Sequence, residues 1–222
     1  MTDVVSVVRE LCEIHVNDGI EFAPDSIRGE EIRLPDEYDG VRIRLDAHLA
    51  EARIPVQIDV AFGDAVVPAP VRETYPTLLD HAAPHVLVYP RETVVAEKLE
   101  AIVSLGVTNS RMKDFYDLHR ISSTAAFNGA TLARAIRATF KRRKTPMPDS
   151  EPLVLAQGFL AEPERMIQWA AFLRRGRLEA PRDVHKLMDD LRAFLLPVLA
   201  AAASGDPYDA TWHPGGPWIK NG

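Results

Sequence analysis

Cysteine is almost absent from this chain of 222 residues, since Cys12 is its only one. A single cysteine excludes an internal disulfide framework, and a reducing cytoplasm is therefore the expected location. No apolar run approaches the ~20 residues that cross a bilayer, so we expect no contact with membranes. The first residues lack the basic start and the apolar core of a signal peptide. Cysteine and histidine nowhere gather at the spacing of a structural zinc site.

Excess positive charge is also absent, because 26 Lys and Arg residues face 32 Asp and Glu residues, for a net charge of −6. This balance excludes a protein that coats nucleic acid over its whole surface. Any site for a polyanion must therefore be a local basic patch. Hydrophobic residues make up 46% of the chain, which indicates an ordinary globular protein with one large or two small domains.

A helix followed by strands is predicted in the first 61 residues. Residues 2–14 have an apolar stripe at helical spacing, and residues 20–22 and 26–33 favour short strands. Residues 41–45 and 54–60 alternate between apolar and polar, which predicts a β-hairpin. Pro55 has no N–H for a β-ladder, so its end of the hairpin should lie at an edge or a bulge.

Asp59 should project from the hairpin face opposite the aliphatic side chains, together with Gln57. Asp is depleted from strands, so an acid in mid-strand is unusual. Two interpretations stay open for Asp59: a solvated outer face, or a carboxylate with a role in a site.

The chain is organised around residues 89–121, which predict two helices with a turn at residues 106–110. Pro90 suits the start of the first helix, and Gly106 suits its end. Lys98 shares one apolar row of this helix with Val94 and Ile102. A lysine in such a row either extends its ammonium to water or meets an anion.

The second helix carries Arg111, Lys113, Asp114 and Asp117, and Ser110 could cap it. Asp114 and Asp117 stand three apart and therefore share one face. This face is either a solvated acidic surface or a pair of rigid carboxylates beside a cation or a substrate hydroxyl.

Residues 131–144 predict an amphipathic helix whose basic face comprises Arg134, Arg137, Lys141 and Lys144. In an acidic chain this face is a candidate for binding a phosphate backbone, and the alternative is a solvated helix surface. Arg174, Arg175 and Arg177 form a second, weaker cluster. Helices are also predicted over residues 162–174 and 181–203, and the tail from residue 204 should be ordered if its tryptophans dock.

Two strings carry a resemblance to a known family: V-V-A-E-K-L-E-A, which contains Lys98, and R-M-K-D-F-Y-D-L, which contains Asp114 and Asp117. They resemble the signature of the AbiEii/AbiGii-type nucleotidyltransferases, which are toxins of abortive-infection and type IV toxin–antitoxin systems. The MenT toxins, which transfer nucleotides to tRNA, are similar. The strings I-D-V-A-F-G-D and W-H-P-G-G-P-W also fit this family, so the resemblance covers nearly the whole chain.

The resemblance implies an α/β fold of the α+β type. An incomplete mixed sheet of the nucleotidyltransferase fold would occupy residues 1–88, a helical domain residues 89–203, and a docked tail residues 204–222. It also implies a transferase that moves a nucleotide from an NTP to tRNA or another RNA end with Mg²⁺. A cognate antitoxin would be a partner protein.

The resemblance further implies roles for individual residues. Lys98 would bind the triphosphate, Asp114 would be essential at the active site, and Asp117 would support it from one turn further on. Arg111 and Lys113 would supply positive potential for polyphosphate or RNA.

One part of the family pattern is missing, namely a glycine-serine element followed by two aspartates, G-S-x-x-x-D-x-D in outline. Asp36-Glu37-Tyr38-Asp39 offers acids without the glycine-serine approach. Asp59 would be the third carboxylate, beside the metal-binding pair, and is thus the catalytic and metal candidate of the hairpin.

Two functions therefore stay open. The chain is either a nucleotidyltransferase whose missing acids come from elsewhere, such as residues upstream of Met1, or a non-catalytic remnant that binds nucleotide, RNA or a partner protein. A phosphohydrolase that uses the same acids is a third.

Overall fold

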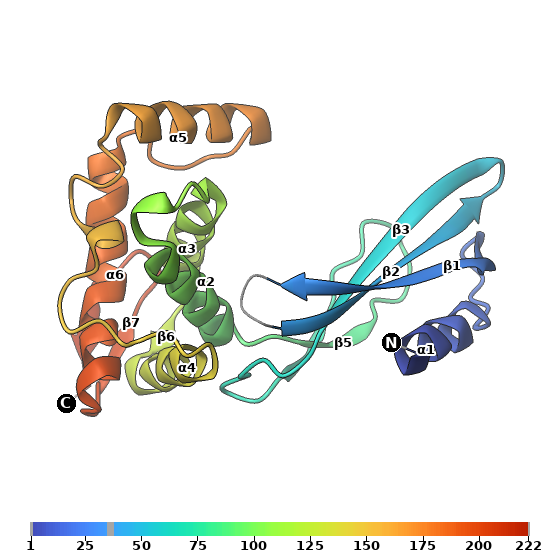
Figure 1. Cartoon of the computed structure of the whole chain (residues 1–222), viewed down its shortest axis with the longest axis horizontal. Coiled ribbons are helices and arrows are strands. Elements are labelled where there is room, and N and C mark those ends of the chain that lie inside the picture. The colour runs from blue at the N-terminus through green and yellow to red at the C-terminus, as the bar shows by residue number, and fades with distance from the viewer. Residues whose placement is uncertain (1, 35–37, 222) are drawn as a thin grey trace. The chain divides into compact units, whose positions relative to one another are not determined.

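The computed structural model describes residues 2–34 and 38–221, which form two compact units, Met1–Asp64 and Ala65–Gly222 (Figure 1). Six α-helices and three small antiparallel sheets make up the described residues, which confirms the α+β class. Asp36 and Glu37 lie outside the described residues, as does the side chain of Asp39. No helix within those ranges is both long and apolar enough to cross a bilayer.

The first unit is a three-stranded sheet with one helix packed against it. Its elements are α1 (Thr2–Cys12), β1 (Ile20–Leu34), β2 (Tyr38–Leu49) and β3 (Ala52–Ala61), in the strand order β1-β2-β3. Val41, Ile43 and Leu45 share one face of β2 and are buried in a small core with Val8 and Cys12 of α1. The alternation in the sequence therefore predicted the core face of β2 correctly.

The predicted hairpin is formed by β2 and β3, which pair from Gly40 opposite Ala61 to Leu49 opposite Ala52. Pro55 lies on the edge strand β3, where its missing N–H costs no ladder hydrogen bond. Every strand pair among the described residues is antiparallel, so these residues do not form the mixed sheet that we expected. The short loops of this sheet explain the difference, because parallel neighbours need long crossover connections.

The first strand is continuous, although the sequence predicted two short strands there. Its pairing with β2 shifts register between Ala23 and Arg28, which marks a bulge. Ser26 bridges this bulge, because its hydroxyl donates to the carbonyl of Ala23 (2.6 Å) and accepts from the N–H of Asp46 (2.8 Å). The irregular residues therefore interrupt the ladder without ending the strand.

The segment after Asp64 belongs to the second compact unit. It contains the hairpin of β4 (Val71–Thr74) and β5 (His85–Val88). Val67 and the buried Thr93 join this segment to the first helix of the unit. The Thr93 hydroxyl donates to the Val67 carbonyl (2.9 Å) and accepts from the Val67 N–H (3.1 Å).

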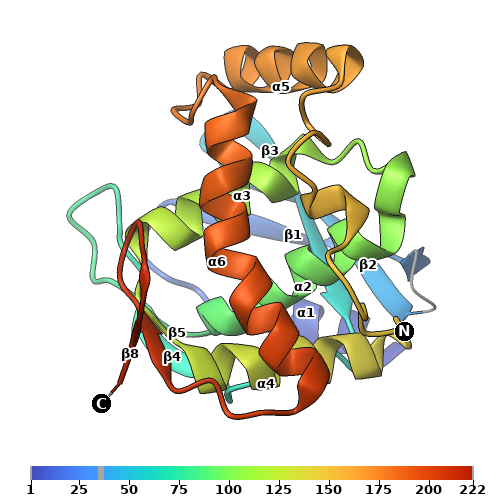
Figure 2. The ribbon, with the colours of Figure 1, turned by 90° about the vertical axis from the view of Figure 1, so that its left-hand side faces the viewer.

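The second unit is mainly helical and holds the larger core. Its helices lie close to the predicted ranges, and α6 packs along α3 and α4 (Figure 2). They are α2 (Arg91–Leu105), the 3-10 turn η1 (Gly106–Thr108), α3 (Met112–Thr124), α4 (Gly129–Arg142), the 3-10 turn η2 (Leu153–Leu155), α5 (Pro163–Gly176) and α6 (Val184–Ser204).

Several helix ends follow from local chemistry. The Asn128 side chain caps α4 by accepting from the N–H of Thr131 (2.9 Å), and Asp183 caps α6 in the same way. Gly205 ends α6 at φ +85, a conformation that glycine adopts without steric cost. Ser110 does not cap α3, and its role at this turn is taken by Asn109, as described below.

The tail docks on the helical unit through its tryptophans. Short strands β6 (Phe127–Asn128), β7 (Ala210–Trp212) and β8 (Trp218–Lys220) form the third sheet. The indole N–H of Trp212 donates to the Ser122 carbonyl (2.7 Å), and that of Trp218 donates to the Phe194 carbonyl (2.9 Å). Gly216 passes so close to the Trp212 ring that a Cβ would lie 2.6 Å from it, so this turn of the W-H-P-G-G-P-W string requires glycine.

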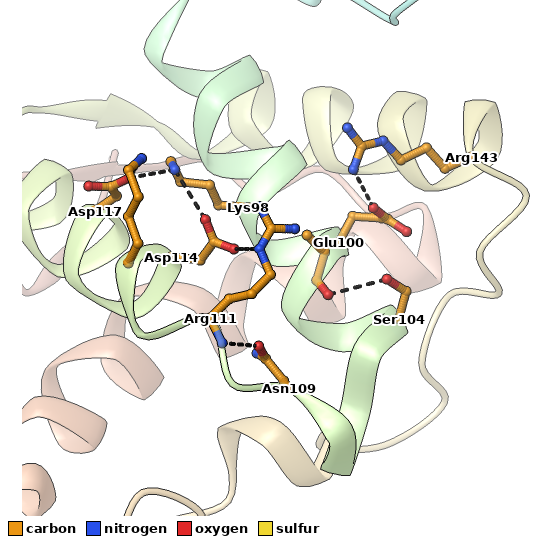
Figure 3. Close-up of polar contacts among 10 residues, drawn as sticks. Lys98, Glu100, Ser104, Asn109, Arg111, Asp114, Asp117 and Arg143 are labelled. Atoms are coloured by element: carbon orange, nitrogen blue, oxygen red, sulfur yellow. Dashed lines mark hydrogen bonds and ion pairs between the residues drawn. The ribbon is translucent and has the colours of Figure 1, made fainter. Parts of the chain in front are cut away.

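A buried acid connects α2 to the end of α4. Glu100 is 1% exposed, and Arg143 donates to its Oε2 at 2.7 Å (Figure 3). The Thr145 hydroxyl donates to its Oε1. A buried charge is tolerated only when it is paired and hydrogen-bonded. Glu100, in the V-V-A-E-K-L-E-A string, therefore has a structural role beside Lys98.

Replacing Glu100 with alanine should lower the free energy of unfolding by about 3–5 kcal/mol, because Arg143 would lose its buried partner. Urea unfolding followed by tryptophan fluorescence measures this, since Trp169, Trp212 and Trp218 all lie in the second unit. Lys186→Ala is the control: it removes an exposed pair with Asp190 and should cost less than about 1 kcal/mol. Equal losses in the two variants would contradict the structural role of Glu100.

Candidate active site

Lys98 holds two carboxylates of the neighbouring helix. Its side chain is only 17% exposed, and its Nζ lies 2.5 Å from Oδ2 of Asp117 and 3.3 Å from Oδ1 of Asp114 (Figure 3). The ammonium therefore meets anions and does not extend to water, which decides between the two interpretations of this lysine. The same contacts show that Asp114 and Asp117 are rigid carboxylates beside a cation and not a solvated acidic face.

Asp114 lies in the first turn of α3 and is 2% exposed. The positive end of the helix dipole favours a carboxylate at this position. Nε of Arg111 lies 2.9 Å from Oδ2 of Asp114, but its N–H is not aligned with that oxygen, which accepts no hydrogen bond within the described residues. Oδ2 is therefore a buried oxygen in an ion pair with Arg111 that keeps its hydrogen-bonding capacity unused.

Asp117 receives two ammonium groups on one oxygen. Nζ of Lys113 lies 2.8 Å from its Oδ2, in addition to the contact from Lys98. Burial by itself raises the pKa of Asp117, but the hydrogen bonds and charges of Lys113 and Lys98 outweigh it, so the pKa lies below the usual 3.8. Asp117 therefore stays ionised and keeps Lys98 in place.

The turn before α3 is held from both sides. Asn109 is 1% exposed, and its Oδ1 accepts from the N–H of Arg111 (2.8 Å). Arg165 of α5 donates to the carbonyls of Asn109 (3.0 Å) and Val107 (2.9 Å), while its guanidinium lies 3.9 Å from the ring centre of Phe159. These contacts fix the start of α3, where Arg111 and Asp114 stand.

Asp59 lies in the first unit and is bound by an arginine. Nε and Nη2 of Arg42 donate to its two carboxylate oxygens at 2.8 and 2.9 Å, on the exposed face that the sequence predicted. The hydrogen bond from Arg42 is the main cause that lowers the pKa of Asp59. The expected proximity of Asp59 to Lys98 and Asp114 stays a prediction, because these residues belong to different units.

The described residues do not fit a Mg²⁺ site. Nowhere in residues 2–34 and 38–221 do three His, Cys, Asp or Glu side chains gather in a way that could hold a metal ion. Both oxygens of Asp59 face Arg42, and Asp114 and Asp117 share Lys98. The role of Asp59 as a metal ligand therefore gains no support from its surroundings.

The basic face of α4 is partly used within the fold. Arg137 donates to the carbonyls of Ala201 (3.2 Å) and Ala202 (3.0 Å) in the last turn of α6, and the Ala201 carbonyl also accepts from the N–H of Gly205 (3.1 Å). Arg137 thus also has a structural role within the fold. Arg134 and Lys141 are exposed, and Lys144 ends the basic run with a φ of +56. RNA binding by these four residues stays a prediction.

The sequence reasoning missed Asn109 and Arg165 as residues that position the site. The T-N-S turn was a local signal for Asn109, because Asn side chains often bind the backbone two residues on. Arg165 had no such signal, since its carbonyl partners stand 56 and 58 residues earlier in the chain.

Acid should remove the stabilising effect of the Asp117 charge. In the unfolded chain Asp117 takes up its proton near pH 3.8, and in the folded chain it does so only at lower pH. The difference in unfolding free energy between wild type and Asp117→Asn should therefore have its full value above about pH 5. It should shrink as the pH falls through the pKa of the folded state. Urea unfolding of both proteins between about pH 3 and 7 measures it. A difference that stays constant, or grows on acidification, would contradict the lowered pKa.

Comparison with known families supports the resemblance seen in the two strings. A family model described as "Nucleotidyl transferase AbiEii toxin, Type IV TA system" matches residues 1–195. No curated protein and no solved structure matches the chain at a significant level. The family implies a nucleotide substrate and an antitoxin partner. Because the match covers most of its length, the chain belongs to the AbiEii nucleotidyltransferase toxin family of type IV toxin–antitoxin systems.

Proposed function

We propose that this chain acts in nucleotidyl transfer from an NTP to a hydroxyl group of RNA, with tRNA among the candidate acceptors. The observation that carries the proposal is the buried pair of Lys98 and Asp114, which the structure brings together from the two strings typical of the family. An ammonium and a carboxylate at one place match the two needs of this reaction, phosphate binding and removal of the hydroxyl proton.

The transfer makes one bond and breaks one. The acceptor oxygen bonds to the α-phosphorus of the NTP, the bond between that phosphorus and the oxygen that bridges to the β-phosphate breaks, and pyrophosphate leaves. The hydroxyl proton must go to a base. Oδ2 of Asp114 is the best candidate in the helical unit, because it is buried and accepts no hydrogen bond from a described residue.

The lysines and Arg111 would hold phosphate. Lys98 has three N–H donors, and its contacts with Asp114 and Asp117 use two of them, so one is left for a phosphate oxygen. Arg111 and Lys113 keep 55% and 71% of their side chains exposed beside the buried carboxylates. They can therefore approach a polyphosphate without leaving Asp114 or Asp117 unpaired.

Mg²⁺ would neutralise phosphate charge in such a reaction. Neither unit by itself brings three acids together among the described residues, so a site for Mg²⁺ would need acids from more than one part of the protein. This observation favours a second candidate function, in which the chain binds nucleotide or RNA without catalysing transfer. Action in the cytoplasm, where a cognate antitoxin would meet the protein, is part of the proposal and agrees with the single cysteine.

Incubating the chain with RNA, Mg²⁺ and NTPs labelled at the α-phosphate tests the two functions. Transfer predicts labelled RNA, and Asp114→Asn should reduce the rate by about 100-fold or more, because a positioned base contributes 10²–10⁴-fold. Lys98→Ala should reduce it as well, while Lys186→Ala, at an exposed pair on α6, is the matched control that should not.

Labelling that persists in Asp114→Asn would contradict the role of this carboxylate. The absence of labelling by the wild-type chain, together with retained binding of NTP or RNA, would establish the non-catalytic function instead.

A further inference from the structure

Arg111 covers the carboxylate that is proposed to receive a proton (Figure 3). Its Nε lies 2.9 Å from Oδ2 of Asp114, whose side chain is 3% exposed, whereas the Arg111 side chain is 55% exposed. Both residues line a pocket of about 650 Å³ that opens between the first turn of α3 and helix α5. The group that covers Oδ2 is therefore an exposed side chain and not a rigid part of the core.

The contact of Arg111 with Asp114 is incomplete for an arginine–carboxylate pair. Arg42 shows the complete form, because its Nε and Nη2 donate to the two oxygens of Asp59 at 2.8 and 2.9 Å. The Nε–H of Arg111 is not aligned with Oδ2, which accepts no hydrogen bond within the described residues. A phosphate offers a guanidinium group the two parallel hydrogen bonds that Asp114 does not provide, so it is the better partner for Arg111.

Asp114 keeps a second cation when Arg111 moves. Nζ of Lys98 donates to Oδ1 of Asp114 at 3.3 Å, and the Lys98 side chain is only 17% exposed. Removing the last partner of a buried charge is strongly destabilising, but this penalty does not arise while Lys98 stays in place. Arg111 can therefore leave Oδ2 without leaving the carboxylate unpaired.

The backbone of Arg111 is held, so its side chain can turn without disturbing α3. Its N–H donates to Oδ1 of Asn109 (2.8 Å), and its carbonyl accepts from the N–H of Asp114 (3.0 Å). The pocket beside the side chain attracts polyanions, because it is lined by three further cations, Lys113, Arg174 and Arg175. A ligand with several phosphates therefore meets Arg111 at a place where the guanidinium can reach it.

We propose that a bound polyphosphate draws the Arg111 side chain away from Asp114 and thereby exposes Oδ2 to the acceptor hydroxyl. In the free protein the same side chain covers this oxygen. The nucleotide must then bind before the acceptor can meet its base, which fixes the order of binding. This inference rests on the proposed function, because it takes the polyphosphate to be that of the NTP substrate.

Binding of inorganic tripolyphosphate to the full chain tests this exchange of partners. Calorimetric titration measures the affinity in the absence of Mg²⁺, RNA and NTP. No transfer can occur under these conditions, so the result is independent of the labelling assay for the proposed function. Four proteins form a double-mutant cycle: wild type, Arg111→Gln, Asp114→Asn and the variant that carries both substitutions. Urea unfolding checks that each of them is folded.

Arg111→Gln should weaken tripolyphosphate binding about fivefold or more, because a charge-assisted hydrogen bond to phosphate is lost. Asp114→Asn should tighten binding, because Arg111 no longer has to leave a carboxylate. This gain should be at least about threefold larger when Arg111 is present than in Arg111→Gln, where only the removal of a negative charge acts.

Two controls separate this coupling from general charge effects. Asp117→Asn removes the same charge one turn further along α3, and its effect should be the same with and without Arg111, because Asp117 pairs with Lys98 and Lys113. Arg182→Gln removes an exposed arginine outside the pocket and should change the affinity less than about twofold.

Three results would overturn the proposal. Unchanged binding in Arg111→Gln would mean that Arg111 stays on Asp114 while the polyphosphate is bound. An equal gain from Asp114→Asn with and without Arg111 would mean that Arg111 contacts the polyphosphate without leaving the carboxylate. The absence of tripolyphosphate binding by the wild-type chain would mean that no polyphosphate draws Arg111 away.

A second measurement needs no substituted carboxylate. In NMR spectra of the wild-type chain, tripolyphosphate should shift the Nε–H signal of Arg111, which is identified by its loss in Arg111→Gln. The Nε–H signal of Arg165 should stay in place, because this group donates to Glu162 and its side chain is 13% exposed. An unshifted Arg111 signal in a chain that labels RNA would remove the exchange and leave the proposed function standing.

Discussion

The pairing of Lys98 with two carboxylates is the interaction on which the candidate site depends. Taking an ammonium or a carboxylate out of water costs several kcal/mol, and this cost is offset only when the partners are held in good geometry. Lys98 comes from α2, and Asp114 and Asp117 come from α3, so the need to compensate these charges fixes one helix against the other. The same arrangement leaves Oδ2 of Asp114 buried but without a hydrogen bond from the described residues. In the proposed function a substrate hydroxyl would reach this oxygen only after Arg111, which lies 2.9 Å from it and is 55% exposed, moves aside.

Local patterns in the sequence predicted much of this arrangement. Alternation predicted the β2–β3 hairpin and its buried face, whereas a lysine within an apolar row left water and an anion as alternatives, between which the structure decided. What local patterns could not predict are side chains that satisfy the backbone of a distant element. Arg137 stands on a regular basic face but reaches the end of α6, more than 60 residues later, and Arg165 binds carbonyls more than 50 residues earlier. Helix ends and turns leave unpaired carbonyls that some donor must satisfy, and the spacing of residues within one helix does not say which donor does so.

Metal binding is the part of the proposed reaction for which the described residues give no support. The family implies nucleotide transfer, and the helical unit contains the lysine and the carboxylates of its two strings. The acid on the sheet, Asp59, is engaged by a bidentate arginine, and the acids within the described ranges form no metal-binding group. In the proposed function, substrate binding and metal binding would therefore be separable. Phosphate binding by lysine and arginine needs no metal, so the helical unit would position an acceptor and a nucleotide even where transfer depends on further acids.

The cations around α3 fall into two groups: buried ones that hold the site in place, and exposed ones that are available to bind a ligand. Lys98 and Arg165 are largely buried, and Lys98 bonds two groups of the chain while Arg165 bonds three, so their charges hold the site together. Arg174 and Arg175 are exposed and engage no acid within the described residues. A polyanion that contacts these two arginines therefore displaces water and counterions only, whereas one that contacts Lys98 must share it with Asp114 and Asp117.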